Sequence, residues 1–482
     1  MEFDDTFFLN PDEALRAARQ QNKRDRYVLQ VCYYDKESAN FDQEQLPNLI
    51  PVSLNNLVDD LALGIHRLPE SISFAGLHLS DEVKKEIVEN FELSVRQAHI
   101  IREELKRYYL KNIKEAKPDF KEPLRFYLYA SAYTQVMQYV SKNIADTLED
   151  MGYEVLFDLD YGTLDVDCQK LLKEFNPHII ISINHMNNSF LGEEVFNFVW
   201  FQDSMPIITN DELIHTRKRD FVFALLPGVK DALYKKGVSS EIQNFCINTN
   251  LYKVDKSIEK KAKVVFIGGS YLENYMPYLS GSNAKDLGEL AGIDTLIHEA
   301  VEIYKADGVF SEDIKYYLAQ KYNKSYQLLN SYVIPFVIRD MTLLELCKMD
   351  IAYDIEVYGW GWEKYEIIKP YYKGVLNYGE DISKVYNGAT YAIVAHPDYL
   401  VQQRTLEAAA SGCIPLVYDC RYKELVTPPY YEDSLVFFQN LSELNDILRK
   451  TPVKKELSTI VDDHKYSSFA KKLIHIVEEK VQ

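Results

Sequence analysis

One segment near the C-terminal end of the 482-residue chain combines residue types that bind anions and polyols. Residues 396–417 are typical of a loop, a helix that Gly412 ends, and a buried strand. Arg404 and Glu407 are three residues apart, so they share a face near the first turn of that helix. The positive helix end and Arg404 suit a diphosphate, and Glu407 can accept hydrogen bonds from a ribose diol. The alternative is an exposed ion pair of little energetic weight, but Gly412 and Pro415 before a strand favour binding.

Two glycine-containing segments follow expected strands and offer further contacts to a nucleotide. Gly268-Gly269-Ser270 comes after residues 261–267, and its glycines would let the backbone approach a phosphate while Ser270 donates a hydrogen bond. A tight strand-to-loop turn explains the same residues. Gly359-Trp360-Gly361-Trp362 follows residues 355–358, and its rings either stack on a base or plug the sheet edge. The sequence lacks the full glycine patterns of dinucleotide and P-loop sites, which disfavours a nicotinamide, flavin or P-loop site.

Two residues in the first half of the chain are candidates for proton transfer. His185 follows the apolar run 178–183 and can serve as a base toward a hydroxyl or orient a donor. The alternative is a loop histidine that pairs with Asn184 or Asn187. Asp203 follows residues 196–201 and is either the general base of an inverting transfer or the cap of an Asx-type turn.

Expected strands alternate with helices over two stretches of the chain. The first stretch, at about 121–255, has expected strands at 124–130, 153–158, 178–183, 196–201 and 221–225. The second, at about 256–465, has them at 261–267, 355–358, 374–377, 390–395 and 414–418, with a helical insert at about 283–350. This alternation predicts an α/β fold with two Rossmann-like domains of parallel strands that face a cleft. Ligands of such sheets bind beyond the carboxyl ends of the strands, where the candidate residues lie.

The two ends of the chain read differently. Residues 1–120 are expected to be mainly helical, with one long helical pattern at about 80–113. The charged stretch 114–123 holds two prolines and marks the first domain boundary. Residues 466–482 are expected to form a C-terminal helix.

Composition limits the functions that remain. Lys+Arg 54 against Asp+Glu 73 gives a net charge of −19, which argues against general nucleic-acid binding and against docking on anionic membranes. The six cysteines stand singly, so neither a zinc ribbon nor a disulfide framework is expected, and no metal ligands are assigned. The first residues are acidic and no apolar run reaches the roughly 18 residues of a membrane span. We therefore expect a cytoplasmic protein with reduced thiols.

The segment 404–415 resembles the donor-site motif of GT-B glycosyltransferases of the group-1-like kind. It is most similar to the CgeB-like (spore maturation protein) branch, which carries an R-x-x-E-x-x-x-x-G pattern. Gly359-Trp360-Gly361-Trp362, the stretch 378–389 and the stretch 199–206 also match that branch. The resemblance covers about 121–430 loosely and 355–420 more specifically.

The resemblance implies a glycosyltransferase without a resident cofactor or catalytic metal. It would move a sugar from a nucleoside diphosphate sugar, with a UDP-sugar as the expected donor, to a hydroxyl of a protein, glycan or small molecule. Glu407 matches the glutamate that binds the nucleotide ribose, Arg404 would face the diphosphate, and Thr405 lies between them. Where group-1 enzymes carry an earlier glutamate for the donor sugar, this chain has Tyr399 with Asp398 beside it. The alternatives are a catalytically degenerate scaffold that binds nucleotide-sugar or a protein partner, and a sugar-nucleotide epimerase.

Overall fold

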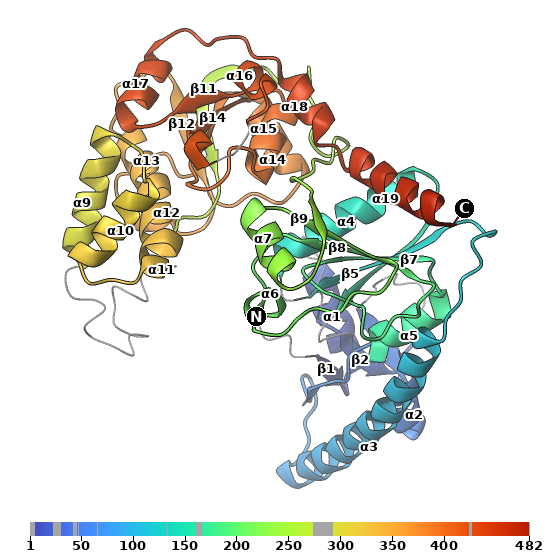
Figure 1. Cartoon of the computed structure of the whole chain (residues 1–482). Helices are drawn as coiled ribbons and strands as arrows, with labels where there is room; N and C mark the ends of the chain where they lie inside the picture. Colours follow the sequence, from blue (N-terminus) through green and yellow to red (C-terminus); the bar gives the residue numbers. More distant parts are fainter. Residues whose placement is uncertain are drawn as a thin grey trace. The chain divides into compact units, whose positions relative to one another are not determined.

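The computed structural model describes residues 5–22, 30–41, 46, 48–64, 66–132, 134–160, 166–272, 293–423 and 427–481 (Figure 1). The chain forms two compact units, Met1–Asn244 with Ala470–Gln482, and Phe245–Phe469. The described residues contain three sheets, and every strand pair in them is parallel. The fold is therefore of the α/β class. Within the described residues, every helix is too short or too polar to span a bilayer.

The first sheet lies in the N-terminal part of the first unit. Its strand order is β3-β2-β1-β4, with β1 (Thr6–Phe8), β2 (Cys32–Asp35), β3 (Leu49–Val52) and β4 (Ser71–Ser73). Its helices are α1 (Pro11–Asn22), α2 (Leu57–Leu63) and α3 (Asp81–Lys114). The expectation of a mainly helical region missed this sheet, because strands of three or four residues are too short to show an alternating pattern.

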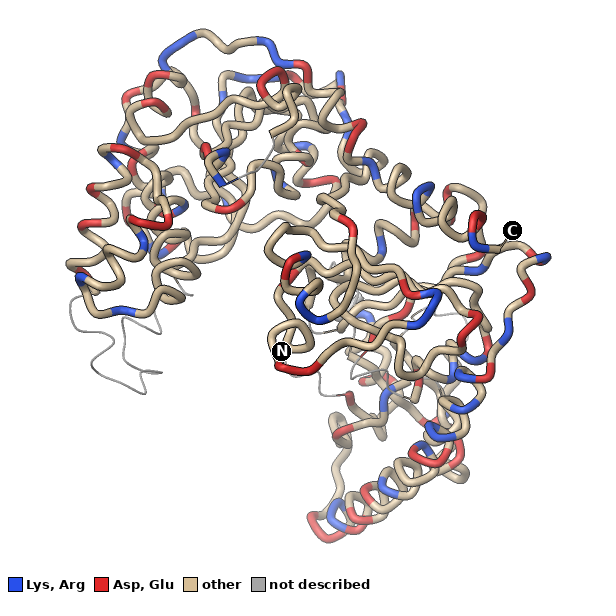
Figure 2. The backbone as a smooth tube through the Cα atoms, viewed as in Figure 1, with Lys and Arg blue, Asp and Glu red and all other residues tan. Residues whose placement is uncertain are grey.

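Helix α3 is the longest element, and its start fits the sequence pattern. The Ser80 side chain accepts a hydrogen bond from the backbone of Val83, and Asp81 and Glu82 follow in the first turn, where the helix end is positive. The buried face of α3 includes Phe91 and Ala98, which join the core of the first sheet. Lys/Arg and Asp/Glu are both present along α3, and the last turns hold only basic residues, which suits the negative end of the helix (Figure 2).

The second sheet has the strand order β10-β9-β8-β7-β5-β6. Its strands are β5 (Arg125–Ser131), β6 (Glu154–Asp160), β7 (Ile179–Ile183), β8 (Phe196–Phe201), β9 (Asp220–Ala224) and β10 (Ser240–Ile242). Its helices are α4 (Gln135–Asp150), α5 (Val166–Phe175), α6 (Pro206–Thr209) and α7 (Pro227–Lys235). Strands β7 and β8 are buried along their whole length, which explains why they read as continuous apolar runs.

The third sheet forms the second unit and has the order β12-β11-β13-β14-β15. Its strands are β11 (Lys261–Ile267), β12 (Asp354–Tyr358), β13 (Ala389–Val394), β14 (Ile414–Tyr418) and β15 (Val436–Phe438). After β11 the chain adds β12 on one side of it, and β13, β14 and β15 then follow on the other side. The point between β11 and β13 is therefore the switch point, the place where α/β sheets bind ligands.

The helices of the second unit include those of the expected insert. They are α9 (Ile293–Ala306), α10 (Glu312–Lys321), α11 (Tyr326–Leu328), α12 (Ile334–Phe336), α13 (Thr342–Leu346), α14 (Glu380–Asn387), α15 (Gln403–Ala410), α16 (Tyr430–Ser434), α17 (Leu441–Arg449) and α18 (Leu457–Asp463). Two π-helical turns, Leu329–Val333 and Val337–Met341, interrupt this run. The start of the expected insert, 283–292, lies outside the described residues.

The expected strand at 374–377 and the expected C-terminal helix at 466–482 have different outcomes in the structure. The stretch 374–377 is not a strand; instead Tyr372 forms an isolated bridge with Val357 of β12, and Gly359 donates to the carbonyl of Gly374 at 2.9 Å. A four-residue pattern carried too little information to separate a strand from an extended loop. The C-terminal helix is present as α19 (Tyr466–Val481), with Gln482 outside the described residues.

Candidate functional site

The loop after β11 is locked to the loop after β12. We call Gly268–Ser270 the glycine loop. Gly268 donates to the carbonyl of Tyr358 at 3.0 Å, and Ser270 donates to the carbonyl of Trp360 at 2.9 Å. Gly359 has a φ of +125°, and a Cβ atom there would lie 2.1 Å from the Gly268 carbonyl oxygen. Only glycine fits at position 359, because the two backbones meet there.

The two tryptophans of the Gly359–Trp362 motif have different surroundings. Trp362 is fully buried, donates from Nε1 to the Gly268 carbonyl at 2.7 Å, and meets Phe266 edge-on at 5.4 Å. Trp360 is 72% exposed at the carboxyl end of β12. The structure therefore gives Trp362 the plugging role, and it leaves the Trp360 ring open to solvent beside the glycine loop.

A buried carboxylate in the second π-helical turn anchors the glycine loop. Asp340 is fully buried and accepts hydrogen bonds from Ser270 Oγ at 2.6 Å, the Tyr271 backbone at 3.0 Å and the Tyr365 hydroxyl at 2.8 Å. Burial raises the pKa of Asp340, although these bonds and Arg339 oppose the rise. Ser270 is thus held by Asp340 and positions the loop.

Arg339 lies next to that carboxylate and reaches both loops of the switch point. Its guanidinium lies 3.8 Å from the centre of the Tyr271 ring, and one nitrogen donates to the Gly269 carbonyl at 3.3 Å. Its Nε approaches the carbonyl of Ala395, just after β13, at 3.5 Å. No carboxylate among the described residues lies within ion-pair distance of Arg339. Burial lowers the pKa of Arg339, Tyr271 and Asp340 oppose this, and the positive charge of Arg404 lowers it further.

Sequence reasoning missed Arg339 and Asp340. Both lie in the expected helical insert, far along the chain from the glycine loop. The signal available was a charged pair inside the otherwise apolar run 333–341, and such a pair in a buried segment needs a structural or functional reason. π-Helical turns are also frequent at functional sites.

Helix α15 carries Arg404 and Glu407, which form an ion pair through one of the two carboxylate oxygens. Glu407 is fully buried, and its Oε2 accepts from Arg404, whose side chain is 34% exposed. The other oxygen, Oε1, is also buried and has no hydrogen-bond partner among the residues that the structure describes. The alternative of an exposed ion pair is therefore wrong for Glu407. An unsatisfied buried oxygen is uncommon and calls for an explanation such as a missing ligand.

Thr405 has a structural contact in this helix. It is fully buried, accepts a hydrogen bond from the Gln402 backbone at 3.2 Å and donates to the Leu400 carbonyl at 3.0 Å. These bonds close the N-terminal end of α15 and set the position of Arg404. Both hydrogen bonds of the Thr405 hydroxyl are therefore made within the protein.

The loop after β13 holds a neutral imidazole. The backbone of Asp398 donates to Nδ1 of His396 at 3.2 Å, which places the proton of the neutral ring on Nε2. Burial, together with the charges of Arg339 and Lys423, lowers the pKa of His396 to about 3. Its ring stacks on Tyr399 at 5.0 Å. Asp398 accepts from Lys423 at 2.7 Å, so its carboxylate is paired.

The predicted residues of the first unit lie at the carboxyl ends of β7 and β8. Asn184 has a φ of +63°, accepts from the backbones of Gln202 and Asp203, and donates to the Asp203 carboxylate at 2.9 Å. Asp203 itself is exposed. The His185 ring has no hydrogen-bond partner among the described residues, so the pairing with Asn184 is not formed. Burial lowers the pKa of His185 although Asp160 opposes this, so the ring is neutral at pH 7.

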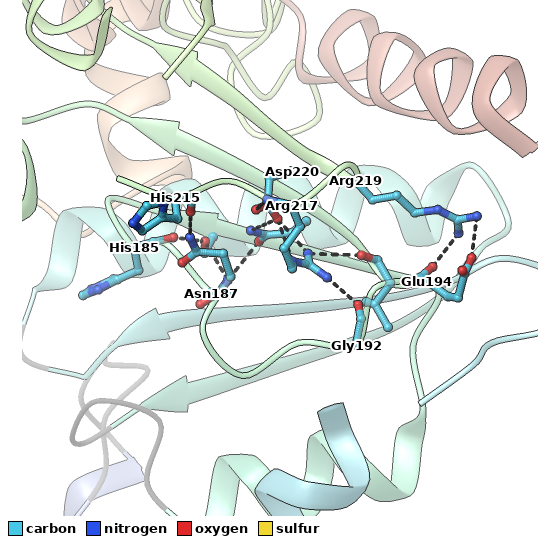
Figure 3. Close-up of polar contacts among 12 residues, drawn as sticks. His185, Asn187, Gly192, Glu194, His215, Arg217, Arg219 and Asp220 are labelled. Carbon is cyan, nitrogen blue, oxygen red and sulfur yellow. Dashed lines mark hydrogen bonds and ion pairs between the residues drawn. The ribbon is translucent and has the colours of Figure 1, made fainter. Parts of the chain in front are cut away.

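A buried polar chain fixes the loop that carries His185 (Figure 3). Asn187 accepts from the Tyr129 hydroxyl at 2.6 Å and donates to Asn197 at 3.2 Å. Asn197 donates to Asp220 at 3.0 Å, and Asp220 is paired with Arg217 at 2.7 Å. Asn187 is thus occupied by this chain rather than by His185, which settles the second alternative for that histidine.

A hollow of about 340 Å³ lies beside the same loop. It is bordered by Asn188, Leu213, His215 and Thr216 among others, and Leu213 is 66% exposed. Asn188 donates to the His215 carbonyl and joins the two sides of the hollow. Amide, hydroxyl and aliphatic groups of this kind suit a polyhydroxylated ligand.

No protein-family model and no curated protein matches the chain. Among solved structures, sucrose-phosphate synthase from Thermosynechococcus elongatus is similar at 9% identity, with 74% of this chain and 99% of that chain covered and a TM-score of 0.42. A glycosyltransferase of avilamycin A biosynthesis is similar at 11% identity, with 73% and 96% covered and a TM-score of 0.42. A glycosyltransferase from Rickettsia africae is similar at 9% identity, with 75% and 99% covered and a TM-score of 0.41. Matches at this level assign no family, substrate or residue to this chain.

Proposed function

We propose that this chain is a glycosyltransferase that uses a nucleoside diphosphate sugar. The observation that carries the proposal is the pair of guanidinium groups, Arg339 and Arg404, at the switch point of the third sheet. Arg339 has no carboxylate within ion-pair distance among the described residues, and the charge of Arg404 lowers the pKa of Arg339. Two neighbouring cations beside a glycine loop are expected to hold a polyvalent anion, and a diphosphate fits that requirement.

The remaining groups at this edge suit the other parts of such a donor. Oε1 of Glu407 is a buried acceptor without a hydrogen-bond partner in the described part of the chain, and a ribose hydroxyl would satisfy it. The exposed Trp360 ring is a surface on which a base can stack. His396 offers a neutral Nε2–H donor near Tyr399, where the donor sugar would lie. We expect a UDP-sugar as donor, and we assign the chain to the CgeB-like branch on its Arg404–Gly412 motif.

The chemistry follows from these charges. Breaking the bond between sugar and diphosphate leaves negative charge on the leaving group, which Arg339, Arg404 and the glycine-loop amides would stabilise. This charge stabilisation is the task that a metal ion performs in other sites, so we propose transfer without one. If the reaction inverts the sugar, His185 or Asp203 would take the proton of the acceptor hydroxyl. If it retains, no protein base is required at that step.

Two further proposals concern the acceptor and the compartment. The hollow beside the His185 loop combines polar and aliphatic groups, which supports a glycan or another polyhydroxylated acceptor. All six cysteines are buried and free, which supports a reducing compartment such as the cytoplasm.

The test is donor turnover in variants of the two cations and the carboxylate. We would screen nucleoside diphosphate sugars for release of the diphosphate by the wild-type protein, then measure Arg339→Gln, Arg404→Ala and Glu407→Ala with the active donor. Each is expected to lower kcat/KM by about 100-fold, since one charge-assisted contact in a dry site stabilises a transition state by about 3 kcal/mol. Arg449→Gln, at the exposed end of α17, is the matched control.

Two results would overturn the proposal. Unchanged turnover in all three variants would remove the switch point from the reaction. Tight nucleotide-sugar binding by the wild type with neither hydrolysis nor transfer, for any acceptor, would favour a binding scaffold instead of an enzyme.

A further inference from the structure

A second hollow lies in the first unit, and none of its lining residues is a candidate for proton transfer or donor binding. It has a volume of about 230 Å³ and lies between the end of α3, the end of α5 and the loop that follows β7. Five of its walls are aliphatic side chains that are at least nine-tenths buried: Ile113, Leu172, Ile180, Leu191 and Val195. The hollow is thus lined mainly by hydrocarbon.

The rim of the hollow is basic. Lys117 and Lys173 border it, and neither has an ion-pair partner among the described residues. Asn112 and Asn176 border it as well, and Asn176 has a φ of +45° at the end of α5. Two ammonium groups without an ion-pair partner in the described ranges, beside a hydrocarbon wall, form an amphipathic site.

The hollow lies at the opposite edge of the second sheet from His185. Pro177 and Val195, which line it, come before β7 and β8, whereas His185 and Asp203 come after them. Parallel strands put all their amino ends at one edge of the sheet. The hollow is therefore separate from the proton-transfer candidates.

The frame of the hollow resists collapse. A Cβ at Gly192 would lie 2.8 Å from the Ala116 carbonyl and 3.0 Å from that of Lys114, so the loop is packed directly against the end of α3. Arg217 donates to the Val195 carbonyl at 3.2 Å and is paired with the buried Asp220. These two contacts hold the Gly192–Val195 loop against the end of α3 and so fix the position of two walls of the hollow.

We propose that this hollow binds a small amphiphile with an anionic head, an aliphatic monocarboxylate. An engineered apolar cavity of about 150 Å³ binds benzene, so this one has room for a short hydrocarbon chain. The chain would cover the five aliphatic walls, and the carboxylate would meet Lys117 and Lys173 at the rim. The inference is independent of the proposed transferase activity, because it uses neither the second unit nor the His185 loop end.

The experiment compares three six-carbon probes that differ only in the head group: hexanoate, hexanamide and hexylammonium. Binding to the full chain is followed by saturation-transfer NMR and by calorimetric titration. We expect hexanoate to bind more tightly than hexanamide, and hexylammonium to bind least. Failure of hexanoate to bind the wild-type protein, or equal binding of all three probes, would overturn the proposal.

Two variants separate the roles of the rim and the walls. Lys117→Gln with Lys173→Gln is expected to weaken hexanoate about fivefold, as for two partly exposed ion pairs, and to leave hexanamide unchanged. The control is Lys111→Gln with Lys121→Gln, which makes the same charge change at exposed positions outside the hollow. Ala116→Leu extends a side chain into the hollow and is expected to abolish binding of both probes. Unaltered hexanoate binding in Ala116→Leu would show that the probe lies elsewhere.

Discussion

The neutral state of His396 gives a prediction whose size follows from the structure. Burial, Arg339 and Lys423 lower its pKa from 6.5 to about 3, although Asp398 opposes the shift. The unfolded chain takes up a proton at this histidine below pH 6.5, while the folded chain does not. The stability that depends on this group is therefore present above pH 6.5 and is lost as the pH falls toward 3.

The perturbation is His396→Asn, whose side-chain oxygen can accept the hydrogen bond that Asp398 donates to Nδ1 at 3.2 Å. Between about pH 7.5 and about pH 5, proton linkage predicts that the wild type loses about 2 kcal/mol more stability than the variant. Other histidines with lowered pKa contribute equally to both proteins, so they cancel in this comparison.

The assay is urea unfolding at both pH values, followed by tryptophan fluorescence. Trp360 and Trp362 lie in the second unit and Trp200 in the first, so a Trp200→Phe background reports on the unit that holds His396. Equal pH dependence in the wild type and His396→Asn would refute the reasoning. Arg339→Gln removes one of the charges that disfavour the imidazolium, so it is expected to reduce the pH dependence in part.

Three further predictions concern the loops and the proposed base. Gly359→Ala is expected to destabilise the second unit by about 3 kcal/mol in a urea titration, because its Cβ would overlap the glycine loop. Gly374→Ala meets no atom within 4 Å and is expected to cost about 1 kcal/mol for its positive φ. Equal losses in the two variants would contradict the packing argument. Trp362→Phe is expected to cost about 1–3 kcal/mol for the lost buried hydrogen bond, while Trp360→Phe leaves the urea midpoint unchanged; a reversed order would contradict the assigned roles. His185→Gln is expected to lower kcat about 100-fold. The wild-type kcat is expected to fall with a midpoint below pH 6.5, because burial lowers the pKa of the imidazole; a midpoint at or above pH 6.5 would argue against a buried base.

The two larger sheets were readable because their strands are long and buried. Runs such as residues 261–267 and 178–183 hold many apolar β-branched residues, and each is followed by a polar or glycine-containing loop. The N-terminal sheet escaped the same reading. Its strands β1 and β4 have three residues each, and they pair with segments that lie far along the chain. Local pattern cannot reveal such a pairing.

Within the candidate site, too, local patterns could be predicted from the sequence and long-range contacts could not. Arg404 and Glu407 were found because three-residue spacing on a helix is a local property. Arg339 and Asp340 were missed because they join the glycine loop across about seventy positions of sequence, and only the tertiary fold brings them there. The two interpretations of the tryptophan motif were also undecidable from residue type, because both rings have the same chemistry. Burial of Trp362 and exposure of Trp360 separate them.

The expectation that two domains face a cleft stays a prediction. The structure describes each unit by itself, and the proton-transfer candidates lie in one while the proposed donor groups lie in the other. Whether both groups act in one reaction is therefore tested by activity. Variants of His185 and of Arg339 are compared for turnover of the same donor and acceptor.

The most direct test of the central claim is a thermal-shift panel with UDP, GDP, CDP, ADP and dTDP on the wild type, Arg339→Gln and the control Arg449→Gln. A ligand at about a hundredfold excess over its Kd stabilises the folded state by about 2.7 kcal/mol, which moves the midpoint measurably. We predict that at least one nucleoside diphosphate raises the melting temperature of the wild type and of Arg449→Gln, and that Arg339→Gln loses the shift. A panel with no shift for the wild type, or an equal shift in Arg339→Gln, would contradict a diphosphate site at the β11–β13 switch point.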